Sequence, residues 1–284
     1  MTSSNGKDWY FVGIPFEFEC MNAGVNLYHQ HFEGPNRSEP LVILHGLLGS
    51  SRNWTSVARS LAEQNTVYCV DLRNHGKSGH TASMGYREMA EDILSWADRQ
   101  WINRFHILGH SMGGKVAMRL ATESPERIQS LIVADIAPRK YMGHHRVEMN
   151  AMLAMPMDTL KSRKEAEGFL DQFGVNDWAL RQFILTNLVR NSATGSLNWQ
   201  VNLTALDRCM EQIAGSPLDA ESQYLGKALF LVGGQANFVV GDDAELIKEH
   251  FPASEMVTFS DSGHNIHVDA KVPFLDAVGC FLDG

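Results

Sequence analysis

The stretch at residues 107–118, ILGHSMGGKVAM, leads from an apolar run through a serine flanked by glycines into a helical pattern. Its centre matches the G-x-S-x-G pattern, in which the serine occupies a strained turn between a strand and a helix. The apolar FHIL before the serine and the helical pattern after it supply the local structure that this motif requires. The stretch therefore predicts a strand, a sharp turn at Ser111 and a helix.

Other apolar runs along the chain resemble the one before Ser111. They are short and nearly continuous, which is typical of strands buried on both faces of a parallel sheet. The runs cover residues 41–46, 66–73, 105–111, 130–138 and 228–234. Helical patterns separate them, so strand and helix alternate. We expect an α/β fold with a mostly parallel, doubly wound sheet, and ligands bound beyond the carboxyl ends of its strands.

Two regions depart from this alternation. Residues 16–20 and 25–32 alternate in polarity, which predicts two antiparallel strands joined by a turn. Residues 139–224 show helical patterns and loops but no convincing buried strand. We expect them to form a helical cap, inserted before the last two strands, over a core domain made of residues 1–138 and 225–284.

Composition limits the classes of partner. The formal net charge is −9 and no basic stripe is present, which argues against nucleic acid. The apolar runs are too short to span a membrane, so no integral membrane association is expected. The four cysteines are far apart and form no C-x-x-C pair, as in a reducing compartment.

The first thirty residues contain no secretory or transit pattern. We therefore expect a cytoplasmic location, or a mitochondrial one if a presequence has been removed. The sequence contains no metal-binding or nucleotide-binding motif, so no metal and no cofactor are implied. The oligomeric state has no signal in the sequence.

A serine hydroxyl needs a base to become a nucleophile, so the motif predicts a later histidine and a carboxylate between the two. We favour His264, in the stretch SDSGHNIH, because the small residues before it leave room for its loop to approach the serine. His267 is the neighbouring alternative.

The carboxylate has more than one candidate. Many hydrolases with this turn supply it from the loop after the run at 228–234, but that loop carries Asn237 instead. An amide does not stabilise an imidazolium as an anion does. Asp135 ends an apolar strand expected beside the serine's strand, where an idle carboxylate would be costly. We favour Asp135, and the pair Asp242 and Asp243 remains the alternative.

An oxyanion formed during acyl transfer needs two backbone N–H donors. Met112, directly after the serine, and Leu47, in the loop after the first apolar run, are the expected donors. Residues proposed to line the substrate pocket are His45, Met152, Phe183 and His267. The methionine-rich part of the cap either adapts to varied acyl chains or fills ordinary packing space.

Together these features resemble the α/β-hydrolases, and within them the YbfF-type esterases and abhydrolase domain-containing protein eleven. The resemblance rests on LHGLLGSSRNW, VDLRNHGKS, ILGHSMGGKVAM, VADIAP, ILTNLVR, WQVNLTAL, SQYLGKALFLVGG and SGHNIH, which span most of residues 38–284. In that family the carboxylate is thought to follow the strand after the serine's helix, which implies Asp135. Its members hydrolyse carboxylic esters, often with short acyl groups, and some are linked to lipid substrates in mitochondria.

We therefore expect a serine hydrolase that cleaves carboxylic esters of short to medium acyl chains and acts on small molecules. A thioesterase, a lipid-ester hydrolase or a lactonase would use the same groups. A non-enzymatic ligand receptor on this fold is an alternative of another class. Haloalkane dehalogenases and epoxide hydrolases are disfavoured, because they would need a carboxylate at position 111.

Overall fold

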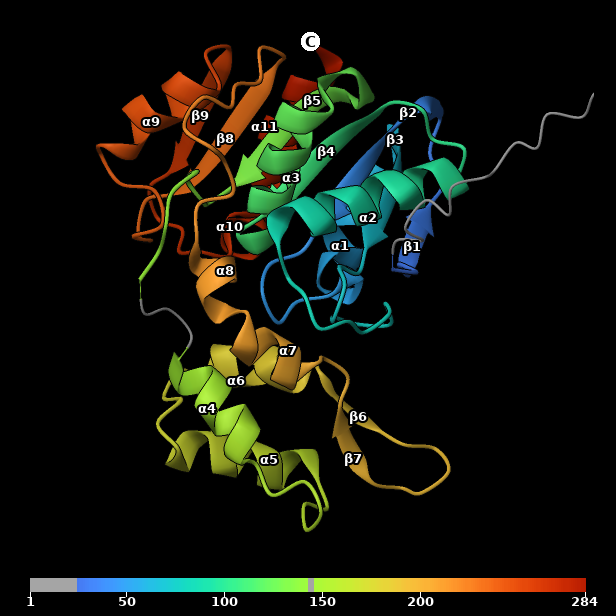
Figure 1. The fold of residues 1–284 in the computed structure, drawn as a ribbon, viewed down its shortest axis with the longest axis vertical. Coiled ribbons are helices and arrows are strands. Elements are labelled where there is room, and N and C mark those ends of the chain that lie inside the picture. The colour runs from blue at the N-terminus through green and yellow to red at the C-terminus, as the bar shows by residue number, and fades with distance from the viewer. Residues whose placement is uncertain (1–24, 143–145) are drawn as a thin grey trace, which may run out of the picture.

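A seven-stranded sheet forms the centre of the protein, with strand order β1-β3-β2-β4-β5-β8-β9 (Figure 1). The computed structural model describes residues 25–142 and 146–284. β1 runs antiparallel to β3, and all other neighbours are parallel. The strands are β1 (His29–Phe32), β2 (Asn36–Leu44), β3 (Asn65–Val70), β4 (Phe105–His110), β5 (Ile128–Ala134), β8 (Ala228–Gly233) and β9 (Ser254–Phe259). The expected fold class, a mostly parallel α/β sheet, is confirmed.

Helices cover both faces of this sheet (Figure 1). The buried cluster on one face includes Trp96 of α2 and Val116 of α3, and the cluster on the other includes Val57 of α1 and Phe274 of α11. These helices are α1 (Thr55–Leu61), α2 (Tyr86–Arg99), α3 (Met112–Glu123), α9 (Asp243–His250), α10 (Ile266–Asp269) and α11 (Lys271–Asp283), with short 3-10 turns η1 (Ser51–Trp54) and η2 (Pro125–Arg127). Because both faces are covered, the central strands are buried and mostly apolar, as in β4, where every residue is buried.

The register of β4 and β5 determines the spacing at the carboxyl edge of the sheet. The two strands pair in parallel as far as His110 and Ala134, which are partners. The residues that follow them, Ser111 and Asp135, therefore leave the sheet side by side. β2 pairs with the other side of β4 as far as Gly109, so the loop after β2 reaches the same edge.

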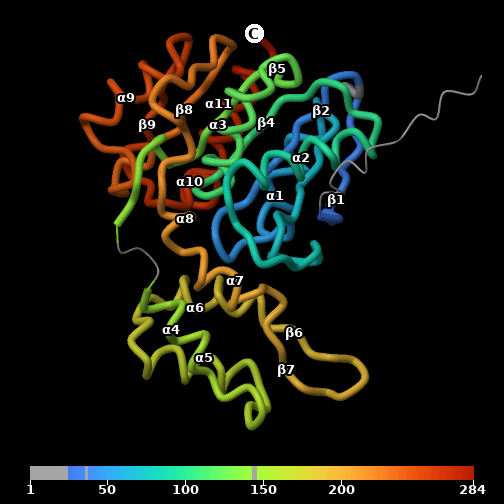
Figure 2. The backbone as a smooth tube through the Cα atoms, in the orientation of Figure 1, coloured from blue at the N-terminus to red at the C-terminus, as the bar shows by residue number. Residues whose placement is uncertain are grey.

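The segment between β5 and β8 leaves the sheet and lies beyond its carboxyl edge (Figure 2). Asn187 Nδ2 donates to the Leu48 carbonyl (2.7 Å) and the Asn202 N–H to the Asn74 carbonyl (2.9 Å), so the segment is joined to loops of the core. Its helices are α4 (Arg146–Ala154), α5 (Arg163–Gln172), α6 (Trp178–Leu185), α7 (Leu203–Arg208) and α8 (Met210–Ala214).

This segment also contains a small hairpin, whereas its sequence pattern predicts only helices and loops there. β6 (Leu188–Arg190) pairs antiparallel with β7 (Leu197–Trp199). The residues between them, NSATGS, had the composition of a plain loop. Each strand has only three residues, which is too short for a period-two pattern to be recognised.

The hairpin predicted near the N-terminus is only partly described. Residues 16–20 lie outside the described part of the chain. Of residues 25–32, only β1 is a strand, and its partner is β3. Among the helices that the structure describes, none combines the length and the apolar character needed to cross a membrane.

Candidate active site

Ser111 lies at the turn between β4 and α3 with a backbone that L-residues rarely adopt. Its φ is 51° and its ψ is −118°. The Ser111 N–H donates to the Ala134 carbonyl (3.0 Å), which fixes the turn to the end of β5. A side chain at Gly109 would collide with the Gly113 carbonyl, so glycine is needed for the helix to start this close to its strand. The turn therefore holds the serine in a strained, sharply defined position.

Asp135 and His264 form a hydrogen-bonded pair, although they come from distant parts of the chain. Nδ1 of His264 lies 2.7 Å from Oδ2 of Asp135. The other carboxylate oxygen accepts the N–H of Gly233, at the end of β8 (2.8 Å). Asp135 is fully buried and, like Ser111, has a positive φ of 51°. The imidazole is thus held at one nitrogen by a carboxylate that the sheet itself positions.

Burial raises the pKa of Asp135 to about 7, because the charged form loses its hydration, and the N–H of Gly233 opposes that effect. An imidazolium at His264 would supply the missing countercharge. The carboxylate is therefore suited to stabilise a histidine that becomes charged during a reaction.

Phe238 and His110 hold His264 from other sides, and Tyr141 positions Phe238. The Phe238 ring stacks on the imidazole, with centroids 3.7 Å apart and planes 18° apart. The Tyr141 hydroxyl donates to the Phe238 carbonyl and accepts the N–H of Ala137 (2.8 Å). His110 Nε2 donates to the His264 carbonyl (2.9 Å). Burial lowers the pKa of His110 to about 3, so this ring is neutral and anchors the loop.

The alternative site residues make other contacts. Oδ1 of Asp243 pairs with Arg139 Nε (2.7 Å), and its Oδ2 accepts the N–H of Val240 (2.8 Å). The neighbouring Asp242 is the N-cap residue of α9. His267 stacks on Trp54, with centroids 4.1 Å apart.

The loop after β2 brings Leu47 to the serine. The Gly49 N–H donates to the Gly46 carbonyl (2.9 Å), which closes a turn around Leu47. An added side chain at Gly46 would lie 3.2 Å from Cβ of Ser111, so the loop approaches closely only with glycine there. Among the described residues, no protein acceptor is found for the Leu47 N–H. Met112 begins α3, where helix N–H groups have no partner within the helix.

His45 ties this loop to the neighbouring strand. Its Nδ1 donates to the Gly46 carbonyl (2.8 Å), and its Nε2 accepts the N–H of Leu72 (3.0 Å). Burial lowers its pKa to about 4, which keeps the ring neutral and able to accept at Nε2. His45 therefore supports the loop, and it also lines the cavity described next.

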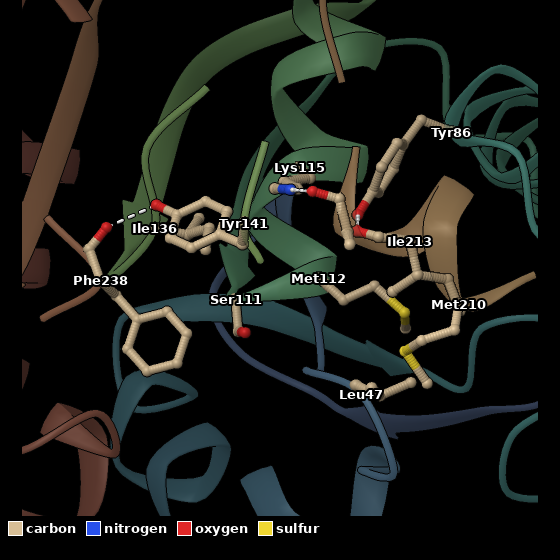
Figure 3. A pocket seen from close by; sticks show the side chains of 11 residues that line it. Leu47, Tyr86, Ser111, Met112, Lys115, Ile136, Tyr141, Met210, Ile213 and Phe238 are labelled. Atoms are coloured by element: carbon tan, nitrogen blue, oxygen red, sulfur yellow. Dashed lines mark hydrogen bonds between the residues drawn. The ribbon is translucent and has the colours of Figure 1, made fainter. Parts of the chain in front are cut away.

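Two cavities meet at Ser111. The outer one has a volume of about 470 Å³ and includes Ser111, His264, Phe183 and His267 in its lining. The inner one is narrow, about 50 Å³, and is lined by Leu47, Tyr86, Ser111, Met112, Lys115, Ile136, Tyr141, Met210, Ile213, Ala214 and Phe238 (Figure 3). The serine thus lies between a wide space that contains the histidine and a narrow, mostly apolar one.

The structure brings most of the predicted site residues together. Ser111, Leu47, His45, Phe183, His264 and His267 line the outer cavity, and Met112 lines the inner one. Met152 lies elsewhere: it is buried in α4, and its carbonyl accepts from Trp199. Sequence reasoning missed Phe238, Tyr141 and Lys115. Only Lys115 had a visible signal, a charge inside the apolar helical pattern after the serine.

Comparison with known proteins agrees with this architecture. The family model for the alpha/beta hydrolase fold matches residues 39–271. The sn-1-specific diacylglycerol lipase ABHD11 of Danio rerio is 35% identical over 91% of this chain and 83% of its own. Esterase YbfF of Escherichia coli K12 is 29% identical over 91% of this chain and 99% of its own.

A solved structure is similar in both sequence and shape. It is described as a marine microorganism esterase, with a TM-score of 0.87, 34% identity, and coverage of 91% of this chain and all of that one. The expected enzyme class, a carboxylic ester hydrolase, agrees with these relatives, and the resemblance inferred from the sequence is confirmed. The chain belongs to the α/β-hydrolase family.

Proposed function

We propose that this protein hydrolyses carboxylic esters of short to medium acyl chain through an acyl-enzyme on Ser111. His264 acts as the base, Asp135 orients it, and the N–H groups of Leu47 and Met112 bind the oxyanion. The observation that carries the proposal is the 2.7 Å contact between His264 and Asp135, in a cavity that Ser111 also lines. The esterase and lipase names of the relatives support the reaction class.

The reaction follows from the roles of these groups. Oγ of Ser111 attacks the ester carbonyl carbon while its proton passes to Nε2 of His264. The carbonyl oxygen becomes negative and accepts two backbone N–H bonds. The carbon–oxygen bond to the alcohol then breaks, and the alcohol leaves with the proton from His264. Water, deprotonated by His264, attacks the acyl group and releases the acid and the free serine.

The charges of the outer cavity bear on the leaving group. Its charged lining consists of Asp177 and Asp269, and none of the described residues that line it is a lysine or an arginine. Histidines such as His110 and His45 are kept neutral by burial. A phosphate-rich leaving group such as coenzyme A would find no cation there. This favours neutral or cationic alcohols and argues against an acyl-CoA thioesterase.

We also propose that residues 139–224 act as a cap that shapes both cavities over the core, residues 1–138 and 225–284. Phe183 and Leu180 of α6 line the outer cavity, and Met210 and Ile213 of α8 line the inner one. Exchange of this segment should therefore alter substrate preference more strongly than it alters the rate of the acyl-transfer steps at Ser111.

The test is a chain-length series of p-nitrophenyl esters, from acetyl to long acyl, with wild type and Ser111→Ala. We expect Ser111→Ala to lower kcat on the scale of about 10⁶, because the three groups act as a unit. Ser192→Ala, at an exposed serine of the β6–β7 turn, is the matched control and should keep wild-type rates. Mass spectrometry of quenched wild type should find the acyl group on Ser111. Retained turnover in Ser111→Ala would refute the proposal.

A further inference from the structure

Lys115 is a buried amine beside the proposed nucleophile. It lies one helical turn after Ser111 in α3, and both residues line the inner cavity (Figure 3). Only 2% of Lys115 is exposed. Lysine is almost never buried this completely unless an anion accompanies it. Its place at the inner cavity therefore needs an explanation that the ester chemistry does not supply.

The amine has protein partners, but none of them is charged. Nζ donates to the carbonyls of Ala214 (3.2 Å) and Gly215 (2.6 Å), and lies 4.7 Å from the centroid of the Tyr141 ring. No carboxylate forms an ion pair with it among residues 25–142 and 146–284. An ammonium has three donors. The two carbonyls engage two of these N–H donors. The third donor is left over, and the positive charge of the amine is not neutralised.

The surroundings add a second cation, and the anions near the Tyr141 ring, Asp135 and Asp243, bond to His264 and Arg139 instead of to Lys115. Arg139 lies over the Tyr141 ring, 4.0 Å from its centroid, and is already paired with Asp243. The hydroxyls of Tyr141 and Tyr86 donate to the carbonyls of Phe238 and Ile213, so both protons are engaged. Burial, aided by Arg139, lowers the pKa of Lys115 to about 7. An anion bound at this end of the cavity would reverse that effect.

We propose that Lys115 binds the far end of the acyl group, and that the preferred acyl groups come from short dicarboxylic acids whose free carboxylate pairs with Nζ. The inference rests on the proposed function, since it is the ester carbonyl at Ser111 that orients the substrate. Lys115 is the fourth residue of α3 and its N–H donates to the Ser111 carbonyl (3.1 Å), so the two Cα atoms are about one helical turn apart, roughly 6 Å, which suits acyl groups of a few carbons. The apolar side chains Ile136 and Ile213 line the intervening space.

The hydrogen bonds to Ala214 and Gly215 alone would give Lys115 a different role, as a tether for the end of α8. An uncharged donor would serve such a tether without the cost of burying a charge. The two roles differ in what they predict: a tether affects all substrates alike, whereas a carboxylate partner changes the preference between charged and neutral acyl groups.

The experiment compares matched pairs of ethyl esters. Monoethyl glutarate carries a carboxylate where ethyl 5-methylhexanoate carries a branched alkyl end of similar shape, and monoethyl succinate and adipate vary the length. Release of ethanol is measured below pH 7, where the amine is protonated. The ratio of kcat/KM, charged over neutral, is determined for wild type, Lys115→Met and Lys115→Arg. Lys164→Met, at an exposed lysine of α5, is the control for the change in net charge.

We expect the ratio to exceed one in wild type and to fall at least about tenfold in Lys115→Met, because a charge-assisted hydrogen bond is lost. Lys115→Arg should restore part of it, and Lys164→Met should not change it. In wild type the ratio should also decline as the pH rises above 7. A preference for ethyl 5-methylhexanoate over monoethyl glutarate, with the same ratio in Lys115→Met, would overturn the inference and leave Lys115 as a tether.

A second measurement separates this inference from the proposed function. Calorimetry with Ser111→Ala compares the binding of glutarate with that of the neutral 5-methylhexanamide, independently of turnover. If Ser111→Ala binds glutarate and the added Lys115→Met substitution abolishes that binding, the inference is supported even if no ester is cleaved. Hydrolysis of both esters, with no glutarate binding and an unchanged ratio, refutes the inference while the proposed esterase stands.

Discussion

The Phe238 ring stacks face to face on the imidazole of His264, with centroids 3.7 Å apart. Phe238 lies in the loop after β8, directly after Asn237, where many hydrolases of this fold carry their acid. An aromatic face attracts a cation through its quadrupole. The loop after β8 therefore contacts His264 through an aromatic ring, while the carboxylate bonded to its Nδ1, that of Asp135, comes from the end of β5.

Replacement of Phe238 by leucine should weaken the charged state of the histidine. The loss of about 0.5–1 kcal/mol of cation–π attraction corresponds to about 0.4–0.7 pH unit. We expect the acidic limb of the kcat/KM profile of Phe238→Leu to move to lower pH by that amount. Phe238→Tyr keeps the aromatic ring, so the acidic limb of its kcat/KM profile should stay at the wild-type pH. An unmoved limb in Phe238→Leu would mean that the ring only fills space.

The identity of the acid can be tested by a pair of charge-neutral substitutions. Asp135→Asn should lower kcat by about 10⁴, because an amide favours the wrong tautomer of the histidine. Asp243→Asn should change kcat little and should mainly lose the contact with Arg139. Both are measured on the same p-nitrophenyl ester. The opposite ranking would move the acid to the start of α9.

The buried acid should also leave a signature in stability. Its pKa is raised to about 7 by burial, whereas an unfolded Asp titrates near about 3.9, so between these values the folded state binds more protons. The contribution of this carboxyl to stability is therefore present at pH 4 and is lost as the pH rises towards 7. The change is of the order of 2–4 kcal/mol.

Urea unfolding at pH 5 and at pH 8 measures this effect. We expect Asp135→Asn to gain stability relative to wild type as the pH rises, while its activity is lost. Parallel pH dependences for the two proteins would contradict the raised pKa.

The close approach of the loop after β2 can be tested at Gly46. A methyl group there would lie 3.0 Å from Nδ1 of His110 and 3.2 Å from Cβ of Ser111, so the loop must shift. We expect Gly46→Ala to lower kcat by about 10²-fold, since small misplacement of an oxyanion donor is costly. Gly168→Ala in α5, where nothing lies within 4 Å, is the control. It should keep wild-type kcat and gain about 0.5–1 kcal/mol of stability.

The sheet was predictable because its strands carry their signal locally. Runs such as the one before Ser111 are mostly apolar and buried on both faces, and turns and helices bound them. The β6–β7 hairpin was not predictable, since three-residue strands show no period. β1 was predicted as a strand, but its extent and its pairing with β3 depend on the sheet, which local alternation does not reveal. Its expected partner, residues 16–20, lies outside the described part of the chain.

The site was predictable to the extent that its chemistry requires particular residue types. A nucleophilic serine demands a base and an acid, and the structure brings the favoured pair, Asp135 and His264, into contact. Their catalytic roles stay a prediction. Phe238 and Tyr141 gave no signal, because their contacts depend on loop conformations that join distant parts of the chain. Met152 was misleading, since a flexible apolar side chain suits a pocket and a core equally.

The position of Asp135, the proposed acid, after β5 also affects how this enzyme could diversify. Ser111 and Asp135 follow paired strands, so the sheet maintains their spacing without help from the loop after β8. That loop, which contains Phe238, is released from holding a carboxylate. Apart from the contacts of Phe238 with His264 and Tyr141, its length and composition can change by evolution or by grafting without displacing Asp135. If Asp135 is the acid, new acyl specificities can arise in a loop that, in many hydrolases of this fold, has to hold the carboxylate.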